Sequence, residues 1–445
     1  MRIIISGAGA VGTHLAKLLS RENMEICLMD ESRERLGQLD ANYDLLTKQG
    51  SGTSLQDLRE LGIKDVDLYI AVTPNESVNI TSCLIANALG AKRTLARIDN
   101  YEYIQPENKG LFERLGLNHL IYPEVLAAKE IGEALRTNWM RYSLQLSGGG
   151  LELCAVKVRT GAAILNKRFA SGYFAHNRYR VVAISRGNET IIPRGNDQIE
   201  AGDLVFFVYK RSEREFVREQ AGKVEKEIRN VIVYGGGRIA QKAVRQIPAN
   251  MQVKIIEPDR ETCYQLAEKM PNVMIINGNA SDMEFLKEEG IEDADAFVAV
   301  TDNAEANIFA CLAAKRFGVR KTIAEVENID YIPMAEGLDI GTVLNKKTIT
   351  ASYIYQLLLD HASVLNVRNL TSADAQVVEF IAQEGSRITK EKIKDLSLPD
   401  NTNVGALVRE DVGILVNGET QVMPGDQVVI FCKSQDIRKL EKFFK

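Results

Sequence analysis

A glycine-rich loop near the start of the chain has the spacing of a pyrophosphate-binding turn. It follows an apolar run that predicts a buried strand, and it consists of Gly7, Ala8, Gly9, Ala10, Val11 and Gly12. In such a loop the first glycine permits a tight turn, the second lets the backbone approach a pyrophosphate, and the third allows close helix packing. The helix N-terminus adds partial positive charge. The spacing therefore predicts a nucleotide site, with an empty vestigial cleft as the alternative.

A second loop of the same kind lies in the other half of the chain. It consists of Gly235, Gly236, Gly237, Arg238, Ile239 and Ala240. Alanine is an accepted variant at the helix-packing position. Arg238 could reach a terminal phosphate through two hydrogen bonds, where the first loop has only Ala10, although an exposed surface arginine is an equal alternative. The two loops are therefore expected to differ in the nucleotide they prefer.

An acidic residue follows each loop at the distance of a ribose-binding carboxylate. Asp30 ends the next predicted strand 18 residues after Gly12, and Glu257 stands 17 residues after Ala240. A carboxylate in this place accepts hydrogen bonds from ribose hydroxyls and disfavours a 2′-phosphate. NAD(H), ATP and ADP therefore fit these sites better than NADPH.

Residues after other predicted strands complete each candidate cleft, because ligands of open parallel sheets lie at the carboxyl ends of strands. The first cleft gains Ser51, Gly52, Thr73 and Pro74, and the second gains Asn279, Ala280 and Thr301. The segments after the third strands are expected to meet the adenine end of a nucleotide. Ordinary turn chemistry explains those segments nearly as well.

The two loops belong to an internal duplication. Landmarks recur at an offset of 228 residues: Gly7 matches Gly235, Asn79 matches Asn307, and Cys83 matches Cys311. Each copy continues into a second similar segment, in which a Gly-Asp pair (202–203 and 425–426) precedes a run typical of a strand. Two copies of a large and a small lobe follow from this repeat.

The repeat predicts an α/β protein with two Rossmann-like parallel-sheet domains, each followed by a small α+β lobe. The expected parts are a first nucleotide-binding domain at 1–120, a crossover helix at 121–140, a first small lobe at 141–220, a second nucleotide-binding domain at 228–344, a second crossover helix at 345–362 and a second small lobe at 363–445. The charged stretch 211–229 is interpreted as a solvated helix and linker between the copies.

Composition excludes several classes of function. The 445 residues are 45% hydrophobic and 26% charged, with a net charge of −5 and no basic block of the kind that binds nucleic acid. Neither a signal peptide nor an apolar run of roughly 20 residues is recognisable, so we expect a cytoplasmic protein without direct membrane insertion. Six scattered cysteines and four unpaired histidines argue against a metal site.

The order of these features resembles the RCK, or KTN, family of regulators of potassium transport, along the whole chain. The likeness depends on the first loop with Asp30, the Ala-Val-Thr strand end at 71–73, the strand around Arg97, and the paired small lobes. The resemblance implies homo-oligomers, with dimers assembling into a cytosolic gating ring beneath a multi-span potassium transporter at the inner face of the plasma membrane. It also implies that Arg97 contacts nucleotide. This contact cannot be carried over to the second copy, where the counterpart is Glu325.

The predicted function is therefore regulatory: nucleotide binding controls the gating of potassium uptake, and no nucleotide is consumed. An NAD-dependent dehydrogenase is one alternative, but the small lobes are small for a catalytic domain and no histidine recurs between the copies. A nucleotide-binding scaffold with no membrane partner is the other alternative. Co-purification with a potassium transporter would separate it from the regulatory function.

Overall fold

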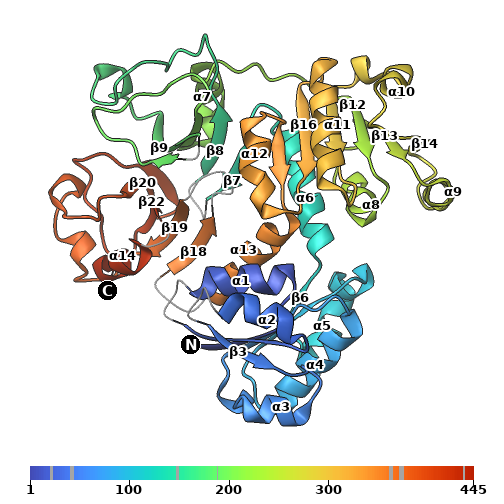
Figure 1. The fold of residues 1–445 in the computed structure, drawn as a ribbon. Helices are drawn as coiled ribbons and strands as arrows, with labels where there is room; N and C mark the ends of the chain where they lie inside the picture. The colour runs from blue at the N-terminus through green and yellow to red at the C-terminus, as the bar shows by residue number, and fades with distance from the viewer. Residues whose placement is uncertain are drawn as a thin grey trace. The chain divides into compact units, whose positions relative to one another are not determined.

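The computed structural model describes residues 1–20, 24–40, 45–146, 150–187, 189–359, 364–369, 375–433 and 436–444. The chain folds into two compact units (Figure 1). The first comprises Met1–Leu126 with Lys346–Leu357, and the second comprises Ala127–Asn345 with Leu358–Lys445.

The first unit contains a six-stranded parallel sheet in the order β3-β2-β1-β4-β5-β6. Its strands are β1 (Arg2–Ser6), β2 (Glu25–Asp30), β3 (Leu46–Gln49), β4 (Leu68–Ala71), β5 (Thr94–Arg97) and β6 (His119–Ile121). Its helices are α1 (Ala10–Ser20), α2 (Arg33–Asp40), α3 (Leu55–Glu60), α4 (Glu76–Ala88) and α5 (Pro106–Arg114), with parts of α6 (Pro123–Arg136) and α13 (Lys346–Leu359). The strand order reverses between β1 and β4, which is where such sheets bind ligands.

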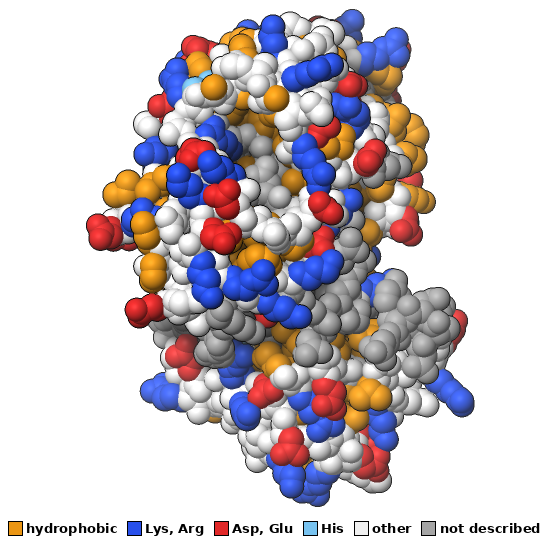
Figure 2. All heavy atoms as spheres, turned by 90° about the vertical axis from the view of Figure 1, so that its left-hand side faces the viewer, with side chains coloured by type: hydrophobic (Ala, Val, Ile, Leu, Met, Phe, Trp, Pro, Cys, Tyr) orange, Lys and Arg blue, Asp and Glu red, His pale blue; other side chains and the backbone are white. Residues whose placement is uncertain are grey.

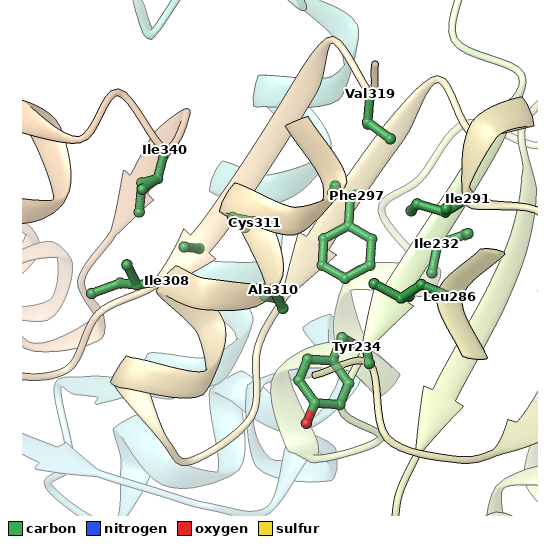
Figure 3. Close-up of a cluster of buried hydrophobic side chains, with 14 of the residues drawn as sticks. Ile232, Tyr234, Leu286, Ile291, Phe297, Ile308, Ala310, Cys311, Val319 and Ile340 are labelled. Atoms are coloured by element: carbon green, nitrogen blue, oxygen red, sulfur yellow. The ribbon is translucent and has the colours of Figure 1, made fainter. Parts of the chain in front are cut away.

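The second unit repeats this sheet in the order β14-β13-β12-β15-β16-β17. Its strands are β12 (Asn230–Tyr234), β13 (Gln252–Glu257), β14 (Met274–Asn277), β15 (Ala296–Ala299), β16 (Lys321–Glu325) and β17 (Thr342–Leu344). Its helices are α8 (Arg238–Val244), α9 (Arg260–Lys269), α10 (Met283–Glu288), α11 (Ala304–Arg316) and α12 (Ile332–Gly337). Figure 3 shows how the core forms: Ile232 and Phe297 of the sheet lie near Leu286 and Ile291, in a cluster that Cys311 of α11 also joins. Buried apolar runs of this kind are typical of strands covered on both faces.

Two antiparallel five-stranded sheets complete the second unit. The first, in the order β10-β9-β11-β8-β7, consists of β7 (Tyr142–Gln145), β8 (Leu151–Lys157), β9 (Tyr179–Arg186), β10 (Glu189–Ile191) and β11 (Leu204–Lys210), with helix α7 (Arg214–Gln220). The second, in the order β18-β19-β22-β20-β21, consists of β18 (Val364–Asn369), β19 (Gln376–Ile381), β20 (Thr402–Arg409), β21 (Val412–Leu415) and β22 (Gln427–Cys432), with helix α14 (Ile437–Phe444). One hydrophobic cluster contains Phe206 of the first sheet and Phe431 of the second, so the two lobes share a core. The predicted fold class is confirmed.

The Gly-Asp turns do more than reverse the chain. Asp203 is buried and forms a two-bonded ion pair with Arg186, at 2.8 Å for each hydrogen bond. Asp426 pairs with Arg409 in the same way, at 2.8 and 2.7 Å. Charge-assisted pairs of this geometry are among the stronger hydrogen bonds in proteins. Each aspartate therefore fastens its turn to the neighbouring strand.

The expectation of a solvated linker at 211–229 was wrong in part. Val217 and Ala221 are buried four residues apart on one helix face, and Ile228 is buried as well. Arg214 forms an ion pair with the buried Glu152, at 2.9 Å. The charged composition concealed an apolar stripe, because the intervening Lys, Arg and Glu residues dominate the stretch.

Charges of both signs cover the surface. On the face shown in Figure 2, Lys and Arg side chains are interspersed with Asp and Glu side chains. No helix among the described residues is long and apolar enough to span a bilayer. Likewise, the described residues contain no cluster of His, Cys, Asp or Glu that could hold a metal ion.

Candidate nucleotide-binding clefts

The first glycine loop connects β1 to α1 and is shaped by two of its glycines. Gly7 has a φ of +112°, in the region that side chains disfavour, and its N–H donates to the carbonyl oxygen of Met29 at 2.8 Å. A Cβ atom at Gly12 would lie 1.9 Å from the Gly7 carbonyl oxygen. One at Gly9 would meet nothing within 4 Å. The loop is therefore tightly packed against α1 and open at its middle glycine.

Asp30 lies directly against this loop. Its Oδ2 accepts a hydrogen bond from the Ala8 N–H at 2.6 Å, and its Oδ1 accepts one from the Ser32 N–H at 2.8 Å. Its side chain is only 10% exposed. Because each carboxylate oxygen has a second lone pair, Asp30 can fix the loop and still accept from a ribose hydroxyl.

The second cleft repeats this contact with a longer side chain. Glu257 Oε2 accepts from the Gly236 N–H at 2.6 Å, and Oε1 accepts from the Asp259 N–H at 2.8 Å. Gly235 has a φ of +98° and Ala240 is fully buried where α8 packs. The structure thus places the loop and the acid of each copy together, as their spacing suggested.

Arg238 is the first residue of α8, and it is exposed. The equivalent position of the first loop is Ala10, which begins α1 and is also exposed. A guanidinium at this helix N-terminus adds a full positive charge to the partial charge of the helix dipole. The second loop therefore presents more positive charge than the first.

A buried asparagine joins the strand ends beside each loop; in the sequence it is visible only as a repeated landmark. Asn79 accepts hydrogen bonds from the N–H and Oγ1 of Thr73, at 2.9 and 2.7 Å. Its Nδ2 donates to the carbonyl oxygens of Thr73 and Arg97, at 3.0 and 2.9 Å. The recurrence of this asparagine at equivalent positions of the two helices was the available signal.

The second copy contains the same clamp. Asn307 accepts from the N–H and Oγ1 of Thr301 at 3.0 and 2.7 Å, and it donates to the carbonyl oxygens of Thr301 and Glu325 at 2.9 Å each. Both asparagines are fully buried. The clamp therefore fixes the carboxyl ends of β4 and β5, and those of β15 and β16, relative to each other.

Arg97 and Glu325 occupy equivalent strand ends but differ in charge and environment. The Arg97 side chain is 21% exposed, and its guanidinium lies 3.7 Å from Asp99. Among the described residues, none accepts a hydrogen bond from its Nε. Glu325 is buried, at 5% exposure. The first cleft thus has a cation at this position where the second has an acid.

The remaining predicted residues of the first cleft lie in turns. The Ser51 N–H donates to Asp57 at 2.8 Å, and Pro74 is exposed directly before the α4 cap. A Cβ atom at Gly52 would lie 2.6 Å from Ser6 Oγ, so this turn lies against the end of β1.

In the second cleft, Asn279 accepts a hydrogen bond from the Tyr234 hydroxyl at 2.9 Å. Ala280 belongs to the hydrophobic core shown in Figure 3, so only its backbone can face a ligand. Ile239 is buried as well. Asn279 and Ala280 follow β14, and Ile239 lies at the start of α8. Their side chains are already used for a hydrogen bond in the turn or for packing in the core.

Family comparisons match the whole arrangement. The TrkA-N domain matches residues 3–123 and 231–346, and the TrkA-C domain matches residues 153–222 and 377–445. The Trk system potassium uptake protein TrkA of Halomonas elongata is 33% identical over 100% of this chain and 99% of that protein. The TrkA of Haemophilus influenzae is 32% identical over the same shares. A TrkA homolog of Archaeoglobus fulgidus is 30% identical over 100% of both chains.

Solved structures share the fold at low sequence identity. The crystal structure of the GsuK RCK domain has a TM-score of 0.60 and 16% identity, covering 100% of this chain and 94% of that one. A structure of the GsuK channel bound to NAD has a TM-score of 0.59 and 14% identity, covering 100% of this chain and 78% of that one. The likeness extends over both copies of the repeat.

Proposed function

We propose a function from the premise that this chain belongs to the TrkA family of Trk system potassium uptake proteins. The chain acts as a cytosolic, peripheral regulatory subunit that binds NAD(H) and controls the gating of a multi-span potassium transporter. Its dimers assemble into a ring at the inner face of the plasma membrane. It binds nucleotide without consuming it.

The observation that carries this proposal is the contact of an acid with the glycine loop in both clefts. Asp30 and Glu257 each accept an N–H of the loop and keep lone pairs for a ribose. The loop N–H groups and the helix N-terminus supply the complementary site for a pyrophosphate. The ribose and pyrophosphate of one nucleotide would thus contact the acid and the glycine loop together, with no rearrangement of the sheet.

NAD(H) is the proposed ligand of the first cleft. Asp30 suits an unmodified ribose, and Arg97 supplies a cation at the neighbouring strand end. The GsuK channel, which shares the fold, has been solved bound to NAD. In the second cleft, Arg238 favours a ligand with a terminal phosphate, so ATP or ADP is the proposed ligand there.

Gating by these ligands requires differential affinity for two ring conformations. A coupling of about 1–3 kcal/mol per site is typical, and several sites in one ring would add their contributions. Two clefts of different specificity would let the ring respond to more than one nucleotide.

Calorimetric titration of NADH, NAD, ATP and ADP tests the proposal. Asp30→Ala removes a charge-assisted hydrogen bond to the ribose, so NADH should bind roughly 10- to 100-fold more weakly. Glu31→Ala is the matched control, because it removes the adjacent, exposed acid. Glu257→Ala should instead weaken ATP or ADP. Unchanged NADH affinity in Asp30→Ala would contradict the assignment, and failure to co-purify with a potassium transporter would favour a scaffold without a membrane partner.

A further inference from the structure

A cavity of ≈360 Å³ lies at the edge of the second parallel sheet that is opposite to its glycine loop. Asp295 and Lys321, which line it, stand where β15 and β16 begin, whereas the loop follows the carboxyl end of β12. The rest of the wall comes from Trp139 and its neighbours, from the end of β8, from the stretch after α7, and from the segment 315–320 at the end of α11. The volume falls within the range of about 300–1,000 Å³ that is usual for small-molecule sites.

The wall of this cavity is strongly basic. Eight Lys and Arg side chains line it, against two carboxylates. Both carboxylates are engaged with residue 229, which is not part of the wall. Asp295 accepts the backbone N–H groups of Arg229 and Asn230 at 2.8 and 3.0 Å, and Glu227 pairs with the Arg229 guanidinium at 2.6 Å. The cations of the wall are therefore poorly neutralised from within it.

One further carboxylate, just outside the wall, serves three of these cations. Arg141, Arg159 and Lys315 all form ion pairs with Asp339. Lys223 also lines the cavity, and no described carboxylate lies within ion-pair distance of it. The cluster thus holds more positive than negative charge.

Lys321 is the most deeply buried member of the cluster. Its Nζ donates to the Met140 carbonyl oxygen at 2.9 Å and to Thr342 Oγ1 at 3.1 Å, which are neutral acceptors. Burial, together with the charge of Arg141, lowers the pKa of Lys321 to about 7. Burial and the neighbouring guanidinium groups lower the pKa of Lys223 to about 8. An anion in the cavity would relieve this repulsion and stabilise the charged forms.

The equivalent edge of the first copy carries similar charges but pairs one cation with its aspartate. There, Lys92 occupies the position of Arg320, and Asp67 occupies the position of Asp295. Lys92 pairs with Asp67 at 2.8 Å. No described carboxylate pairs with Arg320 in the second copy, although the aspartate is kept. The pair between the aspartate and the neighbouring cation is thus formed in the first copy and absent among the described residues of the second.

We propose that this cavity binds a small phosphorylated anion, whose oxygens contact Arg141, Arg159 and the ammonium groups of Lys157 and Lys223. This site is separate from both nucleotide clefts and goes beyond the function proposed above. Guanidinium groups bind phosphate through paired hydrogen bonds, and lysines add point charges. Apolar wall residues such as Met140 and Val319 exclude water and strengthen these interactions. A bound anion would connect the first small lobe with the second Rossmann-like domain.

Trp139 gives a direct test, because it is the one tryptophan of the chain, lines the cavity and is only 7% exposed. Titration of the full-length protein with inorganic triphosphate should change its fluorescence saturably. Lys157→Gln and Lys223→Gln should each raise the Kd by roughly tenfold, since each removes one charge-assisted contact. Lys92→Gln is the matched control in the first copy, and it should leave the Kd unchanged.

The proposal is overturned if the fluorescence does not saturate, or if Lys157→Gln and Lys223→Gln bind triphosphate as tightly as the wild type. The latter result would mean that Trp139 responds to binding elsewhere. Repeating the fluorescence titration with ATP distinguishes a nucleotide ligand from an inorganic one. Tighter binding of ATP than of triphosphate supports a nucleotide, and equal binding supports an inorganic anion. A lysine-dependent response to either ligand supports the site.

Discussion

Asn79→Ala should loosen the strand ends of the first cleft and leave the second cleft unaffected. The substitution removes four hydrogen bonds, two accepted from Thr73 and two donated to the carbonyl oxygens of Thr73 and Arg97. At about 1 kcal/mol each the bonds sum to about 4 kcal/mol, and some of the freed backbone groups regain water. A cost of about 3 kcal/mol is therefore expected. Because it acts on the segment that carries Thr73, nucleotide binding in this cleft should weaken as well.

Hydrogen exchange followed by mass spectrometry measures this effect where it occurs, whereas global unfolding of a multi-domain chain gives no single free energy. About 3 kcal/mol corresponds to roughly 100-fold faster exchange in the segment 70–80. The equivalent segment 298–308, held by Asn307, is the internal control in the same sample. The reasoning is refuted if exchange in 70–80 is unchanged, or if both segments accelerate equally. Asn79→Asp places a buried carboxylate against the carbonyl oxygens of Thr73 and Arg97, so it should accelerate exchange at least as much as Asn79→Ala.

Two further predictions concern charges. Asp426→Ala leaves Arg409 without its buried partner and should destabilise the second small lobe by about 3 kcal/mol, measured as faster proteolysis or exchange in that lobe; wild-type behaviour would contradict it. Sulfate keeps its charge above pH 6, so its affinity for the basic cavity should fall as the pH rises from 6.5 to 9. Lys321 and Lys223, with pKa values of about 7 and about 8, lose their protons in this window. A flat profile in Trp fluorescence would contradict this prediction.

The parts of the fold that the sequence predicted are those encoded by local spacing. Glycines at fixed intervals, an acid after the next strand, and a constant offset between copies are all visible without knowing which strands pair. The confirmed fold class follows from them, because a strand, a glycine turn and a helix in this order form a parallel sheet. Likewise, the Gly-Asp turns indicated the second type of lobe before its sheet was known.

The parts that escaped prediction depend on contacts between distant segments. Asn79 was visible as a repeated residue, but its bond to the Arg97 carbonyl oxygen requires that β4 and β5 be neighbours. The basic cavity needs Arg141 to meet Asp339, 198 residues away. No spacing rule covers such a pair. The stretch 211–229 was misjudged for a related reason, since its three buried residues are few among many charges.

The duplication makes the charge differences between copies informative, because the fold at each pair of equivalent positions is the same. Ala10 is matched by Arg238 at the loop, and Arg97 by Glu325 at the strand end. At the opposite sheet edge, both copies keep the aspartate. Lys92 pairs with Asp67 in the first copy, whereas no described carboxylate pairs with Arg320 in the second. Charge left uncompensated on a shared scaffold costs free energy unless a ligand supplies the counter-charge. We therefore expect the basic cavity beside Arg320 to bind an anion and the equivalent edge of the first copy, where Lys92 is paired, to bind it more weakly.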